Sequence, residues 1–114
     1  REVMIAPHVQ DYVTRIVLAT HLGSSHAPDW LKNEIVVGAS PRGAQAIVSS
    51  AKVAAVVDGR FAVSRHDIAA VAIPALQHRI VRTFEAETDG RSSSSIIERV
   101  LKHVPSVMVG VDHG

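Results

Sequence analysis

The residues from Gly38 to Arg42 combine helix-start signals with a side chain that binds anions. Ser40 is a favoured N-cap residue, because its hydroxyl can accept a hydrogen bond from a free N–H of the first helical turn. Pro41 then falls at the first helical position, where its missing N–H costs nothing. Arg42 faces the positive end of the helix dipole, which is unfavourable unless the guanidinium meets an anion there. The chemistry indicated by this pattern is phosphate binding at a helix N-terminus.

Two interpretations of Arg42 remain open from this pattern alone. Its guanidinium either meets a phosphate at the helix start or extends into solvent, as first-turn arginines often do. His78 and Arg79 raise a similar question, because they follow an apolar stretch and come near a helix end. They either face solvent there, where the helix dipole favours cations, or contact a neighbouring domain or a nucleotide.

Other catalytic and metal-binding patterns are absent from the sequence. It contains no Walker A motif, no His-Glu-x-x-His pair and no Gly-x-Ser-x-Gly elbow, and it has no cysteine. No pair of histidines shows helical ligand spacing with a carboxylate partner. The histidines are His8, His21, His26, His66, His78, His103 and His113. We therefore expect no metal site, and no hydrolase activity from this chain alone.

Length and composition indicate one small domain with an aliphatic core. The 114 residues are 46% hydrophobic but only 4% aromatic, so Val, Ile, Leu and Ala must fill the interior. The formal net charge of +1 gives no support for a nucleic-acid surface. No apolar run approaches the roughly 20 residues that cross a bilayer. Because the chain begins at Arg1 rather than Met, we expect a piece of a longer polypeptide or a processed product.

Apolar spacing predicts two helices in the first half of the chain. The first begins at Pro7 and has Gly23 as its C-terminal cap. The second runs from Pro41 to about Val57, with an alanine-rich buried face. The connector between them contains a short extended piece at 35–37.

Two further helices are predicted in the second half. The third opens at Ser64, where Asp67 forms a short version of the capping box, and it runs to about Arg79. Pro74 lies inside its pattern, so we expect a kink or a break just before that proline. Residues 85–95 contain Asp-Gly and four consecutive serines and are expected to form a flexible loop. A last helix follows over about 96–104.

The expected fold is therefore all-α, a small bundle of about four helices with a minor β contact between its short extended segments. We expect one domain over residues 1–114, with a core at about 3–105. The tail at 106–114 has no clear pattern.

Two functions other than phosphate binding fit this fold class. A small DNA-binding domain would read bases with the third helix. However, the connector from Asp58 to Val63 is longer than the turn of a helix-turn-helix, and apolar residues stand where base-reading side chains are needed. A free-standing helical interaction module would instead bind another protein through the alanine-rich helix at 41–57.

Several linked motifs resemble the C-terminal lid domain of MoxR-type AAA+ ATPases. The resemblance runs from about Val3 to Pro105, and it is specific because the motifs recur together in order and spacing. They are Tyr12, Ala19-Thr20, Gly38-Ala39-Ser40-Pro41-Arg42, Gly59-Arg60-Phe61-Ala62-Val63 with Asp67, Leu76-Gln77-His78-Arg79-Ile80 and Phe84-Glu85-Ala86-Glu87.

The resemblance implies that the chain is the lid of an ATPase whose nucleotide-binding core lies upstream of Arg1. Arg42 matches the sensor-2 arginine, which reaches the ATP phosphates, and Ser40 and Pro41 belong to the same site. ATP and Mg²⁺ would be bound in the parent chain, and neither by this fragment alone. The lid would couple the nucleotide state to conformational change in a chaperone-like machine.

Partners and location are also implied by the resemblance. The lid would contact the upstream AAA+ core of its own chain and neighbouring subunits of a homo-oligomeric ring, commonly a hexamer. Proteins with von Willebrand factor A domains are further expected partners. The expected location is the bacterial or archaeal cytoplasm, with no membrane or nucleic-acid contact.

Three positions depart from the family pattern. The family usually has alanine at Gly43 and arginine at His21 and Gln77. Glycine at position 43 weakens the helix by roughly 1 kcal/mol but leaves the Arg42 side chain free to change its direction. If the arginine usual at position 21 contacts a neighbouring subunit, His21 alters that contact.

Overall fold

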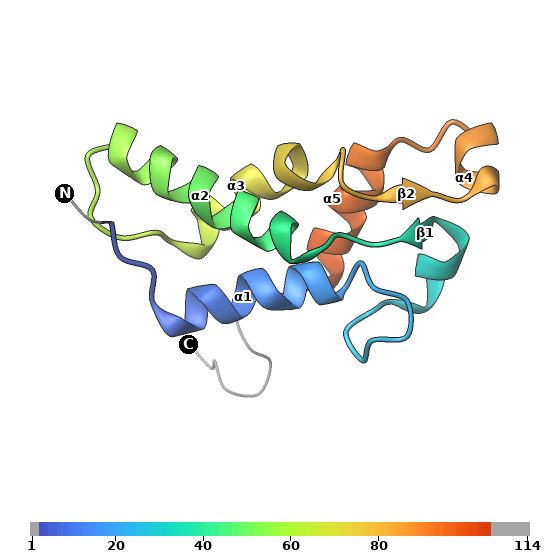
Figure 1. Cartoon of the computed structure of the whole chain (residues 1–114), viewed down its shortest axis with the longest axis horizontal. Helices are drawn as coiled ribbons and strands as arrows, with labels where there is room; N and C mark the ends of the chain where they lie inside the picture. The colour runs from blue at the N-terminus through green and yellow to red at the C-terminus, as the bar shows by residue number, and fades with distance from the viewer. Residues whose placement is uncertain (1–2, 106–114) are drawn as a thin grey trace.

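Four helices of eleven or more residues surround the interior of the computed structural model, which describes residues 3–105, and a small sheet extends from one end of them (Figure 1). The elements in chain order are α1 (Pro7–Leu18), the 3₁₀ helix η1 (Asp29–Asn33), β1 (Ile35–Val37), α2 (Pro41–Val57), α3 (Arg65–Leu76), β2 (Val81–Arg82), α4 (Phe84–Thr88) and α5 (Ser93–His103). The described residues are therefore mainly helical, and the expectation of a small helical bundle is confirmed.

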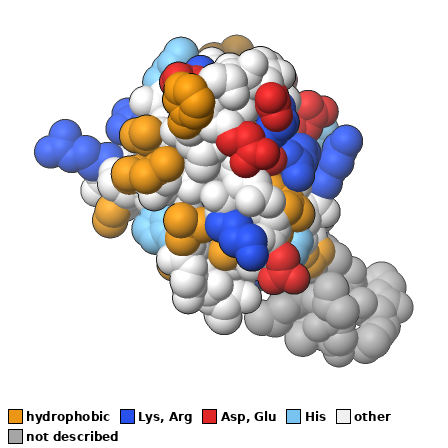
Figure 2. Space-filling model, turned by 90° about the vertical axis from the view of Figure 1, so that its right-hand side faces the viewer, with side chains coloured by type: hydrophobic (Ala, Val, Ile, Leu, Met, Phe, Trp, Pro, Cys, Tyr) orange, Lys and Arg blue, Asp and Glu red, His pale blue; other side chains and the backbone are white. Residues whose placement is uncertain are grey.

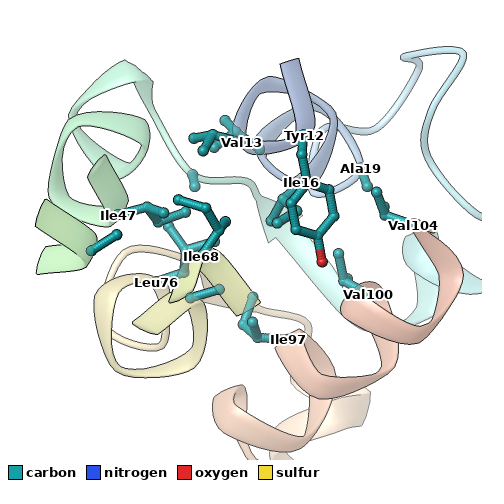
Figure 3. Close-up of a cluster of buried hydrophobic side chains, with 14 of the residues drawn as sticks. Tyr12, Val13, Ile16, Ala19, Ile47, Ile68, Leu76, Ile97, Val100 and Val104 are labelled. Atoms are coloured by element: carbon teal, nitrogen blue, oxygen red, sulfur yellow. The ribbon is translucent and has the colours of Figure 1, made fainter. Parts of the chain in front are cut away.

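Aliphatic side chains from α1, α2, α3 and α5 form one common core. Ile16, Ile47, Ile68, Leu76 and Ile97 are fully buried, and Figure 3 shows them converging on the space between the four helices. Removing each such side chain from water contributes roughly 1.5–3 kcal/mol of stabilisation. The predicted core of Val, Ile, Leu and Ala is thus confirmed.

The starts of α2 and α3 lie where the sequence predicts them. The Ser40 hydroxyl caps α2. At α3, the Ser64 hydroxyl accepts from the Asp67 N–H at 3.1 Å, and the Asp67 carboxylate accepts from the Ser64 N–H at 2.8 Å. This reciprocal pair is a capping box. The sequence predicts both helix starts correctly because each helix carries its own start signal.

Asp67 also ties α3 to the segment that precedes it. The Arg60 guanidinium donates to both carboxylate oxygens at 2.7 Å, and it also contacts Asp58. These hydrogen bonds, first of all those from Arg60, lower the pKa of Asp67 from 3.8 to about 2. The segment held in this way makes a parallel bridge between Met4 and Ala62.

The small sheet consists of β1 and β2, which run antiparallel. It confirms the predicted minor β contact. Beside it, the buried carboxylate of Glu34 accepts a hydrogen bond from Arg91 at 2.8 Å and forms an ion pair with Arg99 at 3.2 Å. The Arg99 guanidinium lies 4.0 Å from the centre of the Trp30 ring. Figure 2 shows acidic and basic side chains gathered side by side at this end of the molecule. The ion pairs and the cation–π contact therefore join the sheet region to α5.

Two predicted helix ends are wrong. The first helix ends at Leu18 rather than near Gly23, because side-chain hydroxyls take up the last carbonyls. Thr20 Oγ1 donates to the Val17 carbonyl at 2.7 Å, and Ser24 Oγ donates to that of Leu18 at 2.6 Å. The third helix ends at Leu76 rather than near Arg79, and it passes through Pro74 without a break.

The prediction of a loop over residues 85–95 is also wrong. The stretch holds most of α4, a turn, and the first residues of α5. Thr83 caps α4, and Ser92 caps α5 by accepting from the Ser95 N–H at 3.1 Å. The serines are therefore helix-start residues rather than a loop. The tail at 106–114 lies outside the described residues.

Candidate functional site

The first turn of α2 lies where three other segments meet. The strand β1 leads into it through Gly38 and Ala39, the end of α1 lies against that connection, and the end of α3 packs beside the turn itself. Figure 1 shows the beginning of α2 directly beside the end of α1. The sequence-predicted site residues Ser40, Pro41 and Arg42 therefore occupy a junction that several elements position.

Ser40 satisfies the backbone donors of this turn. Its hydroxyl accepts from the Arg42 N–H at 3.2 Å, and its carbonyl accepts from the Gly43 N–H at 2.8 Å. Pro41 has no N–H to offer. The N–H groups of Arg42 and Gly43 therefore already have acceptors within the chain. An anion here would be bound chiefly by the side chain of Arg42.

The Arg42 guanidinium is exposed and has no hydrogen-bond or ion-pair partner within the part of the chain that the structure describes. No acidic residue is near Arg42 in the sequence, which has no Asp or Glu between Glu34 and Asp58, and none between Asp67 and Glu85. The start of α2 and the end of α3 both fall within these acid-free stretches. The positive charge of Arg42 is therefore not offset by an acidic side chain on either of these two stretches.

A second arginine lies beside the same turn. The backbone of Gly43 approaches α3 so closely that an added Cβ would lie 2.9 Å from Leu76 Cδ2 and 3.7 Å from Arg79 Cδ. Arg79 Nε donates to the Ala75 carbonyl at 3.1 Å, which holds the side chain along the end of α3. The structure thus brings Arg79 next to the first turn of α2, a proximity that sequence spacing alone did not reveal.

The end of α1 holds the connection into α2. The buried Thr20 hydroxyl accepts from the Ala39 N–H at 3.0 Å, and His21 Nε2 donates to the Ala39 carbonyl. Gly38 lies so close to the Thr20 carbonyl oxygen that a side chain at this position would collide with it. Sequence reasoning named Thr20 within the Ala19-Thr20 motif but missed these contacts. The polar residues at the end of an otherwise apolar stripe were the available signal.

No metal centre was found among residues 3–105, where no group of three or more His, Asp or Glu side chains could hold an ion. His113 lies outside this range. The described helices also include none with the length and apolar character needed to cross a membrane. The site therefore consists of cationic and hydrogen-bonding groups only.

Comparison with known proteins identifies the fold and the family. Residues 30–100 match the AAA lid domain family. The chain is 37% identical over 94 residues to the chaperone MoxR1 of Mycobacterium tuberculosis, an alignment that covers 82% of this chain. It is also similar to the crystal structure of a Cytophaga hutchinsonii protein assigned as an ATPase, with a TM-score of 0.85, 34% identity and 91% of this chain covered.

Both relatives are much longer than this chain. The matched region is 25% of MoxR1 and 32% of the Cytophaga hutchinsonii chain. The family match covers more than half of the present sequence and includes β1, α2, α3, β2, α4 and the first eight residues of α5. The chain therefore belongs to the AAA lid domain family, as a lid domain of the MoxR type.

Proposed function

We propose that this chain is the nucleotide-responsive lid of a MoxR-type AAA+ ATPase, and that Arg42 is its sensor-2 arginine. The observation that carries the proposal is the exposed, unpaired guanidinium at the start of a helix held by three neighbouring segments. An unpaired cation on a stretch of sequence without Asp or Glu suits a polyanion such as the triphosphate of ATP. Ser40 and Pro41 contribute by setting the direction of the first turn.

The chemistry proposed for Arg42 is charge stabilisation. A guanidinium that contacts the terminal phosphate stabilises the charge that spreads over its oxygens as the phosphoryl group leaves. ATP and Mg²⁺ would be held by a core domain elsewhere in the parent protein, which would also supply the Walker motifs. The lid alone would therefore bind no metal and hydrolyse no ATP.

The same contact would couple nucleotide state to lid position. A guanidinium that binds the terminal phosphate loses that partner after hydrolysis, so the two nucleotide states interact differently with the lid. The buried face of α2, at Gly43, Ile47, Ala51 and Ala55, packs into the common core. A pull on the first turn of α2 would therefore move the bundle as one body.

We further propose that the far end of α2 contacts other protein surfaces in an assembled ring. Val53 is 63% exposed and Val57 81% exposed, whereas solvent-facing helix positions are usually polar. The proposed partners are the core domain of the same chain, neighbouring subunits of a hexameric ring, and proteins with von Willebrand factor A domains. The proposed location is the cytoplasm.

Steady-state ATP hydrolysis by the full-length parent protein tests the proposal. Arg42→Ala should lower kcat at least about tenfold, because one transition-state charge contact is lost. Arg42→Lys should recover only part of the rate, since an ammonium cannot reproduce the guanidinium geometry. The matched control is Arg65→Ala, which removes the first-turn arginine of α3. An unchanged rate in Arg42→Ala would remove the sensor-2 role.

A further inference from the structure

We propose that Thr20 and His21, just after the end of α1, are positioning residues that set the direction of Arg42 by holding the backbone of Ala39. This inference rests on the proposed function of Arg42. Its geometric basis is independent of nucleotide, because the two side chains together bind both backbone polar groups of one residue. That residue lies three positions before Arg42.

Thr20 forms the buried half of this contact. Its hydroxyl donates to the Val17 carbonyl at 2.7 Å and accepts from the Ala39 N–H at 3.0 Å. The side chain is fully buried, so water cannot replace either bond. An unpaired backbone N–H in such a place is costly, which makes the Thr20–Ala39 contact a strong constraint on the chain.

His21 makes the second contact with Ala39, and its side chain is partly buried. Its Nε2 lies within hydrogen-bond distance of the Ala39 carbonyl oxygen. A carbonyl can only accept, so Nε2 must carry the proton in this contact. With its N–H held by Thr20 and its C=O held by His21, the peptide groups on both sides of Ala39 are fixed against α1.

The constraint extends to Arg42 because the intervening residues have little freedom. Ala39 is fully buried, and its Cβ would lie 3.2 Å from a Cβ placed on Gly43. Ser40 then caps the helix, and Pro41 fixes its own backbone φ angle. A rotation of Ala39 would therefore redirect the whole first turn.

A comparison of two helix starts supports this role. The first turn of α3 contains Asp67, whose carboxylate secures the N-cap from within the same helix. The first turn of α2 contains no acidic residue and no capping box. A carboxylate there would also neutralise Arg42. Anchoring from α1 holds the turn and leaves the guanidinium without an acidic neighbour.

A double-mutant cycle in the full-length parent protein tests the inference, with ATP hydrolysis as the readout. His21→Leu removes the donor and should lower kcat about three- to tenfold, in line with the loss of one hydrogen bond and some misalignment of Arg42. His21→Gln keeps an N–H donor and should recover most of the loss. In the Arg42→Ala background, His21→Leu should change kcat by less than about 1.5-fold, because its effect acts through Arg42.

Thr20→Ser and His8→Leu complete the set. Thr20→Ser retains the hydroxyl and should keep kcat within about twofold of the parent. His8→Leu removes an exposed histidine from the other end of α1 and should leave kcat unchanged. Hydrogen exchange at residues 38–43 of the parent protein should rise in His21→Leu and not in His8→Leu.

Two outcomes would overturn the inference, and they are distinguishable. If His21→Leu lowers kcat by the same factor with and without Arg42, the histidine stabilises the protein generally rather than positioning Arg42. If Arg42→Ala alone leaves kcat unchanged, the proposed sensor-2 function fails first and the positioning role fails with it. A loss in His21→Leu that depends on Arg42 and is restored by His21→Gln supports the inference.

Discussion

Leu76, at the end of α3, lies against Gly43 in the first turn of α2 so closely that a methyl group added to the glycine would come 2.9 Å from Leu76 Cδ2. The contact sets how closely the two helices approach at the candidate site. It also predicts that position 43 accepts only small residues. The Cβ of Ala39 bounds the same space on another side.

We predict that Gly43→Ala changes the free energy of unfolding by less than about 1 kcal/mol. Alanine raises helix propensity by roughly 1 kcal/mol, and a small shift of the Leu76 side chain offsets that gain. Gly43→Leu should cost more than about 2 kcal/mol, because the larger side chain cannot fit between Leu76 and Ala39. Urea unfolding of the two variants measures the difference. Equal stabilities would contradict the close packing.

The ion pair between Asp67 and Arg60 predicts a pH dependence of stability. The pKa of Asp67 is lowered from 3.8 to about 2 by the Arg60 guanidinium and the Ser64 hydrogen bonds. A depressed carboxyl pKa stabilises the folded state above pH 4, and this contribution is lost as the pH falls toward 2. Asp67→Asn should therefore cost about 1–2 kcal/mol at pH 7, allowing for solvent screening of the pair.

The same comparison at low pH provides the control. Near pH 2 the Asp67 carboxyl of the unsubstituted chain is partly protonated. The difference in free energy of unfolding between this chain and Asp67→Asn should therefore shrink. Urea unfolding at pH 7, 4 and 2.5 measures it. A gap that stays constant over this range would show that the Asp67 charge contributes nothing to stability.

We predict that replacing Glu34 changes the fluorescence emission of Trp30. Its buried carboxylate pairs with Arg91 and Arg99, and Arg99 lies over the Trp30 ring. Glu34→Gln weakens both pairs and should release Arg99 from Trp30, which changes the tryptophan emission. We expect a loss of stability of about 1–3 kcal/mol, because the two arginines can turn partly into solvent. Trp30 is the one tryptophan in the sequence, so the emission reports the surroundings of this ring.

Lys102→Ala is a suitable control for this change, because Lys102 is an exposed cation on the same helix as Arg99. It should leave both emission and stability unchanged. Identical emission spectra for Glu34→Gln and the unsubstituted chain would contradict the proposed link between the ion pairs and the indole ring.

The sequence predicts those helix starts that carry their own signals. Ser40 and Pro41 place the start of α2 correctly, and Ser64 with Asp67 does the same for α3. Each signal acts within a few residues, through hydrogen bonds that the local chain can form by itself. The aliphatic core follows from spacing in the same way.

The wrong loop prediction and the missed support of the candidate site involve contacts between residues far apart in the sequence. The serines at 92–95 suit a loop or a helix start equally well, and Arg91 bound to Glu34 across 57 residues of chain favours the helix start. The hydrogen bonds of His21 and Thr20 with Ala39 likewise join residues that lie 18 and 19 positions apart in the sequence. No local pattern encodes such pairings, so the support of the candidate site could not be predicted.

A structure of the complete parent protein with a bound, non-hydrolysable ATP analogue tests the central claim most directly. The account predicts an Arg42 guanidinium nitrogen about 2.7–3.1 Å from an oxygen of the terminal phosphate, with the Ser40 cap and the Ala39 contacts intact. A guanidinium that points into solvent, or a terminal phosphate bound only by other residues, would contradict it.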